Sequence, residues 1–259
     1  MLPMKAILVV SFGTSYLDAL DKNIKAIEET IQTAYPNYKL YRAFTSKMII
    51  KKLKLVHDIK IDTVPQAIER MLKDGITDLI VQPTHIINGI ENDSMIEEIK
   101  LQKDKFNYIS FGMPLLSTTN DYLKVVDIIA KYYKPANNDI LILMGHGTTH
   151  YANSVYPALD YTFKQQGYSN IFVGTVEGYP DIKDVISLVD KQNASNVTLL
   201  PLMLVAGDHA QNDMASDDED SWKSQVKQQG YEVHAIVKGL GEIEEIRNLY
   251  LEHIAEALR

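Results

Sequence analysis

Short apolar runs alternate with longer amphipathic stretches along the whole chain. The apolar runs are rich in Val, Ile and Leu, which is typical of strands buried on both faces of a parallel sheet. The stretches between them repeat apolar positions with the period of a helix. The pattern therefore predicts an α/β fold in which helices cover parallel sheets on both sides. We expect strands at residues 5–11, 38–44, 77–82, 106–112, 139–145, 170–176, 196–203 and 231–237. We expect helices at residues 17–34, 64–74, 118–133, 181–191, 216–229 and 241–258, among others.

The chain also contains an internal repeat. The segment 9–15 matches 143–149, and the later segment 78–91 matches 196–209. The repeat predicts two pseudo-symmetric domains, residues 1–135 and 136–259, each a four-stranded parallel sheet flanked by helices. Two such halves are expected to face each other across a cleft lined by the carboxyl ends of their strands, where open α/β sheets bind ligands. The sequence does not decide whether the final helix packs on its own half or on the other.

An acidic run, Asp217–Asp220, follows Ser216 and precedes a helical pattern. Serine is a favoured helix cap, and acidic side chains are favoured in the first helical turn. We therefore predict that Ser216 caps the helix at 216–229, rather than that the run forms an acidic metal site.

Composition limits the chemistry that this chain can perform. There is no cysteine, so any metal must be held by His, Asp, Glu or Met. The net charge of −8 argues against binding nucleic acid. No stretch reaches the ~20 apolar residues that a spanning helix needs, so no membrane partner is expected. The N-terminus runs directly into a predicted strand instead of a signal peptide, so we expect a cytoplasmic protein. A homo-oligomer is left open.

The repeat singles out three residues of the second half, namely His146, Glu177 and His209. Their counterparts in the first half are Phe12, Ser46 and Glu91. Each of the three follows the carboxyl end of a predicted strand, beside or close to a glycine, so the three side chains are expected to converge at one edge of a sheet. Two histidines and a carboxylate with open positions suit a divalent ion such as Co²⁺, Ni²⁺, Fe²⁺ or Zn²⁺.

Other interpretations of these residues compete with a shared metal site. Each histidine taken alone is more often a hydrogen-bonded surface group than a ligand. His146 and His150 have the spacing of a helical zinc pair, but no glutamate follows the first histidine and the segment starts at a strand end. Gly145–Gly147 resembles the start of a dinucleotide loop but lacks the third glycine, and no P-loop is present. We therefore expect no nucleotide.

Several segments together resemble the anaerobic sirohydrochlorin cobaltochelatases of the CbiK type, in the class II chelatase superfamily. They are 11–15 (SFGTS), 82–89 (QPTHIING), 144–150 (MGHGTTH), 176–180 (VEGYP) and 202–213 (LMLVAGDHAQND). The resemblance covers essentially the whole chain. It implies that Co²⁺ is inserted, as the substrate metal, into a tetrapyrrole during anaerobic cobalamin biosynthesis, with no organic cofactor. It also implies that His146, Glu177 and His209 hold the metal and that His146 accepts a proton.

The tetrapyrrole carries carboxylates, so an acidic protein must offer local donors to bind it. The contacts that we expect are Ser11, Thr14, Ser15, Lys47, Thr148 and Thr149. Glu91 is also expected at the substrate, across the cleft, where a second carboxylate could assist. Of the two catalytic histidines, we assign proton abstraction mainly to His146 and metal delivery mainly to His209 with Glu177. Asp208 is expected to hydrogen-bond a nearby ring N–H and so to support metal binding.

Other functions remain open at this point. A nickel or iron chelatase would use the same pocket on the same tetrapyrrole. A non-catalytic metal- or tetrapyrrole-binding protein would need no proton acceptor. A metal-dependent hydrolase would require a second cluster of Asp and His, which we cannot assemble from this sequence.

Overall fold

The computed structural model describes residues 3–136, 138–189 and 194–259. The chain forms two compact units. The first contains the residues up to Ser117 together with Gly241–Arg259, and the second contains Thr118–Leu240. These units differ from the predicted halves 1–135 and 136–259, because one helix at the middle of the chain and one at its end each pack on the other side of that division.

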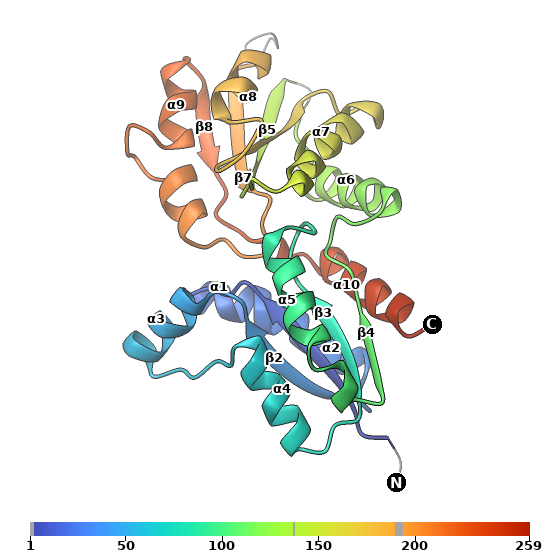
Figure 1. Cartoon of the computed structure of the whole chain (residues 1–259). Coiled ribbons are helices and arrows are strands. Elements are labelled where there is room, and N and C mark those ends of the chain that lie inside the picture. The colour runs from blue at the N-terminus through green and yellow to red at the C-terminus, as the bar shows by residue number, and fades with distance from the viewer. Residues whose placement is uncertain (1–2, 137, 190–193) are drawn as a thin grey trace. The chain divides into compact units, whose positions relative to one another are not determined.

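The first unit is a four-stranded parallel sheet with the order β2-β1-β3-β4 (Figure 1). Its strands are β1 (Lys5–Ser11), β2 (Lys39–Phe44), β3 (Asp78–Pro83) and β4 (Tyr108–Phe111). Its helices are α1 (Leu17–Ala19), a π-helical segment (Leu20–Lys25), α2 (Ala26–Ala34), α3 (Lys47–His57), α4 (Val64–Lys73), α5 (Ile90–Lys100), a 3-10 turn (Lys103–Lys105) and α10 (Glu244–Ala257).

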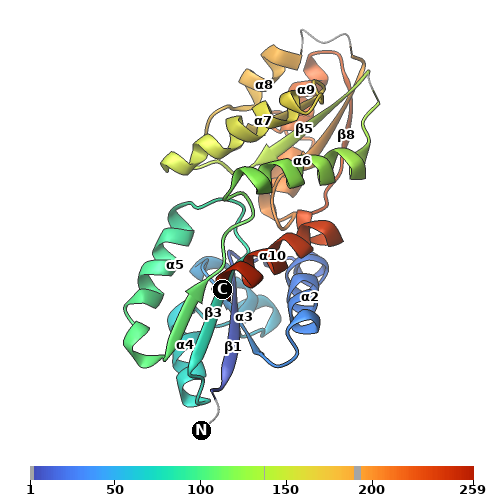
Figure 2. The same ribbon diagram turned by 90° about the vertical axis from the view of Figure 1, so that its right-hand side faces the viewer.

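Helices cover both faces of this sheet, as the apolar character of its strands requires. On one face α4 and α5 bury apolar side chains such as Ile68, Met71 and Ile99 against β1 and β3. On the other face α10 lies beside α2 and contacts β3 and β4 (Figure 2). The C-terminal helix is held there by fully buried Tyr250, whose hydroxyl donates to the carbonyl of Thr84 at 3.0 Å.

The second unit repeats the same design with the strand order β6-β5-β7-β8, again all parallel (Figure 1). Its strands are β5 (Asp139–Gly145), β6 (Ile171–Thr175), β7 (Asn196–Pro201) and β8 (Glu232–Ala235). Its helices are α6 (Thr119–Tyr133), a 3-10 turn (Tyr151–Ser154), α7 (Val155–Gln165), α8 (Ile182–Val189), a π-helical turn (Ala210–Met214) and α9 (Trp222–Gln228), and a 3-10 turn (Leu240–Glu242) leads back to the first unit. No helix among the described residues is both long and apolar enough to span a membrane.

Matching backbone hydrogen bonds show that the two sheets are equivalent. In the first unit Ser46 N donates to Phe12 O at 3.2 Å, and in the second Glu177 N donates to His146 O at 2.8 Å. The alignment of the repeat, which sets Glu177 opposite Ser46, is therefore present in the backbone itself.

All eight predicted strands are present, each within two residues of its predicted ends. The predicted cap of the helix at 216–229 is wrong. Helix α9 begins after Ser221, whose hydroxyl accepts from Ser224 N at 3.1 Å, while the Ser216 hydroxyl contacts Asp218 in the preceding turn. The helix starts at this point because Trp222, its first residue, is buried in the core. Of the predicted helix at 181–191, positions 190 and 191 lie outside the described residues.

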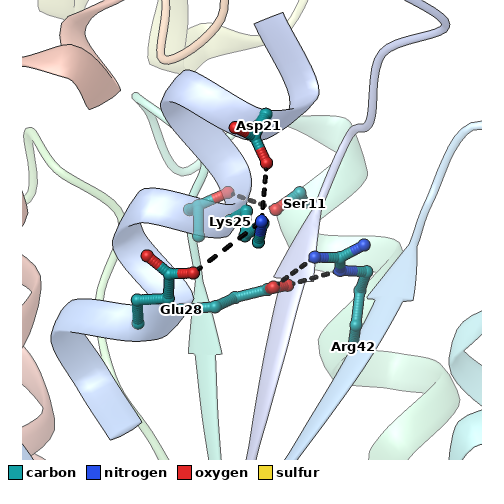
Figure 3. Close-up of polar contacts among 7 residues, drawn as sticks. Ser11, Asp21, Lys25, Glu28 and Arg42 are labelled. Atoms are coloured by element: carbon teal, nitrogen blue, oxygen red, sulfur yellow. Dashed lines mark hydrogen bonds and ion pairs between the residues drawn. The ribbon is translucent and has the colours of Figure 1, made fainter. Parts of the chain in front are cut away.

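A buried ion pair joins α2 to β2 in the first unit (Figure 3). The Glu28 carboxylate accepts from both Nε and Nη2 of Arg42, with the Nε contact at 2.6 Å. The two side chains are only 9% and 27% exposed, for Glu28 and Arg42 respectively. One turn away, Lys25 and Asp21 form a comparable contact at 2.8 Å, but those side chains are 53% and 65% exposed.

We predict that Glu28→Ala lowers the free energy of unfolding by about 3 kcal/mol, since it leaves the Arg42 charge poorly solvated and unpaired. The matched control, Asp21→Ala, removes a solvent-exposed pair and is expected to cost less than about 1 kcal/mol. Urea unfolding at pH 7 measures both values. Equal losses in the two variants would show that burial does not strengthen the pair.

His85 follows β3, and burial dominates the environment of its ring. Neither ring nitrogen reaches solvent or has a hydrogen-bond partner among the described residues. Burial lowers the pKa of His85 from 6.5 to about 4, although the nearby charge of Glu91 opposes the shift. The ring is therefore neutral at pH 7.

This environment gives a pH dependence with a definite sign. Between pH 6.5 and about 4 the unfolded chain binds a proton at His85 that the folded chain does not. The contribution of neutral His85 to the free energy of unfolding is therefore fully present above pH 6.5. It declines as the pH falls toward 4, by up to about 3 kcal/mol. We expect His85→Asn to lose less stability than the wild type between pH 7 and 4.5, as measured by urea unfolding. The exposed His57, replaced in the same way, is the control. Parallel pH curves for His85→Asn and the wild type would contradict the prediction.

Candidate metal centre

The side chains of His146, Glu177 and His209 gather in the second unit. One potential ligand atom from each lies within 4.8 Å of the other two. Within the described residues, this is the one group of three or more His, Cys, Asp or Glu side chains close enough to hold an ion. The two histidines are partly buried and the glutamate is exposed. The three side chains thus converge as predicted, although only His146 and Glu177 closely follow their strands, and His209 precedes the π-helical turn after β7.

The two imidazole rings face each other through their Nε2 atoms, which are 3.1 Å apart. The rings are nearly perpendicular, with an interplanar angle of 87°. An ion at about 2.0–2.1 Å from each nitrogen would separate two neighbouring ligands by about 3.0–3.4 Å. The observed spacing therefore fits two ligands of one ion. The Glu177 carboxylate also approaches His146, with one oxygen 3.8 Å from Nδ1 of that ring.

The hydrogen-bond partners of the rings assign their tautomers. Nδ1 of His146 is 2.9 Å from the carbonyl oxygen of Gly147, which can only accept, so Nδ1 carries the proton. Nδ1 of His209 is 2.6 Å from the Asp213 carboxylate and by the same reasoning donates to it. In the neutral rings both Nε2 lone pairs are consequently free and directed toward one another. Such a pair attracts a cation or a proton.

Glycine allows the loops that carry His146 and Glu177 to approach closely. Gly147 has φ +84°, and a Cβ there would lie 2.5 Å from the backbone nitrogen of Gly178. Any side chain at Gly147 would therefore push the two loops apart. The backbone bond from Glu177 N to His146 O continues the parallel pairing of β5 and β6 beyond their ends. The separation of these two ligands is thus set by the backbone.

The side chain of Asn153 links the same two loops by hydrogen bonds. Its Oδ1 accepts from Thr148 N at 3.1 Å, and its Nδ2 donates to Tyr179 O at 2.6 Å. Thr148, a predicted tetrapyrrole contact, is partly buried, and its hydroxyl accepts from His150 N at 3.1 Å.

His150 does not join this group. Its Nδ1 accepts from Ala152 N at 3.2 Å, so it caps the short 3-10 turn that follows, and its ring packs on Tyr151. The segment that begins at His146 is a loop and not a helix, which is why the spacing of a helical zinc pair does not apply to it.

His209 is held by the π-helical turn Ala210–Met214. Both end residues of that turn are fully buried in the core of the second unit. The turn places Asp213 four residues after the histidine and on the same side. The structure thus gives the Nδ1 contact of His209 to Asp213, which the sequence analysis did not name. The role of Asp208 stays a prediction. The spacing of a histidine and an aspartate by four residues was a usable signal, but only if the segment had been recognised as helical.

The remaining predicted contacts belong to the first unit. Ser11 and Thr14 are buried, and their hydroxyls accept from the Thr84 hydroxyl at 2.8 Å and from Tyr16 N at 3.2 Å, respectively. Figure 3 shows Ser11 at the end of its strand. Ser15 is partly buried, whereas Lys47 and Glu91 are exposed in the first turns of α3 and α5. Their role toward a tetrapyrrole stays a prediction.

The chain resembles known proteins over nearly its full length. Residues 5–259 match the family described as cobalt chelatase (CbiK). A sirohydrochlorin cobaltochelatase of Salmonella typhimurium is 41% identical over 255 residues, covering 98% of this chain and 96% of the relative. Sirohydrochlorin cobaltochelatase CbiKC of Nitratidesulfovibrio vulgaris is 27% identical over 263 residues, covering 99% and 92%.

Solved structures share the fold at lower sequence identity. SirB from Bacillus subtilis with Fe³⁺ superposes with a TM-score of 0.68 at 15% identity, covering 98% of this chain and 95% of that one. CbiX, the terminal enzyme for siroheme biosynthesis in denitrifying bacteria, superposes with a TM-score of 0.61 at 15% identity, covering 98% and 100%. The two four-stranded parallel sheets are thus chelatase-like. Together with the full-length match in sequence, they show that this chain belongs to the CbiK family of cobalt chelatases.

Proposed function

We propose that this protein is a sirohydrochlorin cobaltochelatase, which inserts Co²⁺ into sirohydrochlorin during anaerobic cobalamin biosynthesis. The observation that carries the proposal is the pair of Nε2 atoms, 3.1 Å apart and both free to bind an ion, beside the Glu177 carboxylate. The 41% identity to a cobaltochelatase over almost the whole chain supports the same conclusion.

The reaction asks two things of the protein. Two pyrrole N–H bonds break, and their protons must leave as the nitrogens bind Co²⁺. The ion must also exchange its water for protein ligands that later release it. Neutral imidazole serves both purposes at pH 7, since its free nitrogen binds a metal or accepts a proton. A single carboxylate neutralises part of the ion's charge without the tight hold of a thiolate.

The two histidines differ in what supports them. The Asp213 carboxylate accepts a hydrogen bond from Nδ1 of His209, and such a partner strengthens a histidine as a metal ligand. At His146 the acceptor nearest to Nδ1 is a neutral carbonyl at 2.9 Å, the Glu177 carboxylate is farther away at 3.8 Å, and the side chain is 41% exposed. We assign metal binding mainly to His209 with Glu177, and proton acceptance from the pyrrole mainly to His146.

The anionic substrate requires positive charge from a protein whose net charge is −8. Helix α3 supplies it locally, because it contains four lysines and no acidic residue. It begins directly after β2, at the carboxyl edge of the first sheet. Met48 and Leu55 on the same helix are 75% and 73% exposed and offer apolar surface beside the charges. We propose that Lys47 and Lys51 meet substrate carboxylates, with Ser15, Glu91 and Thr148 as further contacts and with Ser11 and Thr14 shaping the adjoining loop.

The same donor set also suits Ni²⁺ and Fe²⁺. A nickel or iron chelatase is therefore the alternative within this class, and a non-catalytic metal- or tetrapyrrole-binding protein is the alternative outside it. Purified protein mixed with sirohydrochlorin and Co²⁺, Ni²⁺ or Fe²⁺ in turn distinguishes them by absorbance. We expect catalysed insertion that is fastest with Co²⁺. Binding of sirohydrochlorin without turnover for any ion would overturn the proposal.

We predict that His146→Ala lowers the rate of insertion by about 10²–10⁴-fold even at saturating Co²⁺, because general acid–base catalysis is lost. His209→Ala is expected to be partly rescued by raised Co²⁺, because it loses a ligand and keeps the base. Initial rates over a range of Co²⁺ concentrations measure both effects. Equal rescue of the two variants by Co²⁺ alone would contradict the division of roles.

We predict that the double variant Lys47→Ala, Lys51→Ala raises KM for sirohydrochlorin about tenfold and leaves kcat unchanged, since two exposed ion pairs together contribute about 1.4 kcal/mol. Added salt should reduce the difference from the wild type. The control is Lys105→Ala, an exposed lysine at the opposite end of the same sheet. An unchanged KM in the double variant would show that α3 does not meet the substrate.

A further inference from the structure

The closest contact that either histidine of the metal centre makes is between Nδ1 of His209 and Oδ2 of Asp213, at 2.6 Å. We propose that Asp213 is a positioning residue, which holds His209 in the tautomer that presents an unprotonated Nε2 to the ion. This inference rests on the proposed role of His209 as a metal ligand. It assigns to Asp213 control over how tightly the centre binds Co²⁺.

Asp213 lies on a short, well-anchored turn that also positions His209. His209 precedes the π-helical turn as its N-cap and Asp213 lies on the turn four residues later, so the two side chains meet on one side of it. Ala210 and Met214 of that turn are fully buried, which pins it to the core. Local π-helical geometry of this kind is frequent at functional sites. The carboxylate thus reaches the ring without any motion of the backbone.

The chemistry requires an acceptor at that nitrogen. A neutral imidazole carries one proton, and whichever nitrogen donates a hydrogen bond leaves the other free to bind a metal. Without an acceptor at Nδ1, the proton is free to move to Nε2. It would then lie between Nε2 of His209 and Nε2 of His146, which are 3.1 Å apart, and would occupy the place of the ion. A carboxylate opposes this arrangement more strongly than a neutral acceptor because its hydrogen bond is charge-assisted.

The internal repeat offers a comparison within the same chain. By the alignment of the repeat, Glu91 stands in the first unit where His209 stands in the second, and Met95 stands where Asp213 stands. Met95 is buried in the apolar core of its unit. The first unit therefore lacks both the histidine and the carboxylate, which is expected if the two residues work together.

The test compares Asp213→Ala, Asp213→Asn and a matched control, Glu219→Gln, which removes the same charge from an exposed position in the following turn. Co²⁺ affinity is measured by calorimetry without any tetrapyrrole. The tautomer of His209 is measured by ¹⁵N NMR of the metal-free protein. We expect Asp213→Ala to weaken Co²⁺ binding about 10–100-fold and to increase the Nε2–H form of His209. Asp213→Asn should keep the tautomer and lose less affinity, because its amide oxygen still accepts from Nδ1. Glu219→Gln should match the wild type.

Other outcomes would overturn the inference. They are an unchanged tautomer and affinity in Asp213→Ala, or equal losses of affinity in the alanine and asparagine variants with no change of tautomer, which would indicate only a charge effect. Asp213→Ser, whose side chain is too short to reach the ring, repeats the comparison if alanine disturbs the turn. Because neither measurement uses sirohydrochlorin, absence of chelatase activity in the wild type would refute the proposed function and leave this result interpretable.

Discussion

The parallel pairing of β5 with β6 and β7 is the interaction on which the metal centre depends. It brings the carboxyl ends of three strands to one edge, so His146, Glu177 and His209 emerge side by side although they are far apart in sequence. Glycine at position 147 then lets two of the loops touch through their backbones. The spacing of His146 and Glu177 therefore follows from the sheet, and the π-helical turn after β7 adds His209.

The first unit has the same scaffold with different side chains at the same places. Phe12 and Ser46 make the backbone bond that His146 and Glu177 make in the second unit. Phe12 is 42% exposed and has no polar donor. The fold therefore provides the backbone geometry twice, and only the second copy carries the three side chains that could hold a metal. We propose that the lysine-rich α3 gives the first unit a different task, the recognition of the anionic substrate.

Most of the fold could be read from the sequence, because runs such as residues 5–11 and 139–145 are too apolar for any place but a covered sheet. The division of the chain into its two units could not be read from the sequence. An amphipathic pattern shows that a helix buries one face, but not which sheet receives it, and both α6 and α10 pack beyond the predicted boundary. The true cap of α9 escaped prediction for a related reason. Ser216 and Ser221 are both good caps, and the burial of Trp222 selects between them.

The grouping of His146, Glu177 and His209 could be predicted because the repeat compares equivalent positions in one chain, and only one copy carries histidine there. The hydrogen-bond partner that supports His209 could not be predicted. The contact of Asp213 with His209 depends on the geometry of one short π-helical turn, which sequence patterns do not specify. Contacts between neighbouring loops, such as that of Gly147 with Gly178, are likewise a property of the folded sheet.

The central claim is that Nε2 of His146 and Nε2 of His209 bind one ion together with Glu177. X-ray absorption spectroscopy of the Co²⁺-loaded protein, without tetrapyrrole, tests it most directly. The geometry predicts two imidazole nitrogens and a carboxylate oxygen at about 2.0–2.2 Å from cobalt, with one imidazole lost in either His→Ala variant. A cobalt site whose imidazole signal is unchanged in both variants would contradict it.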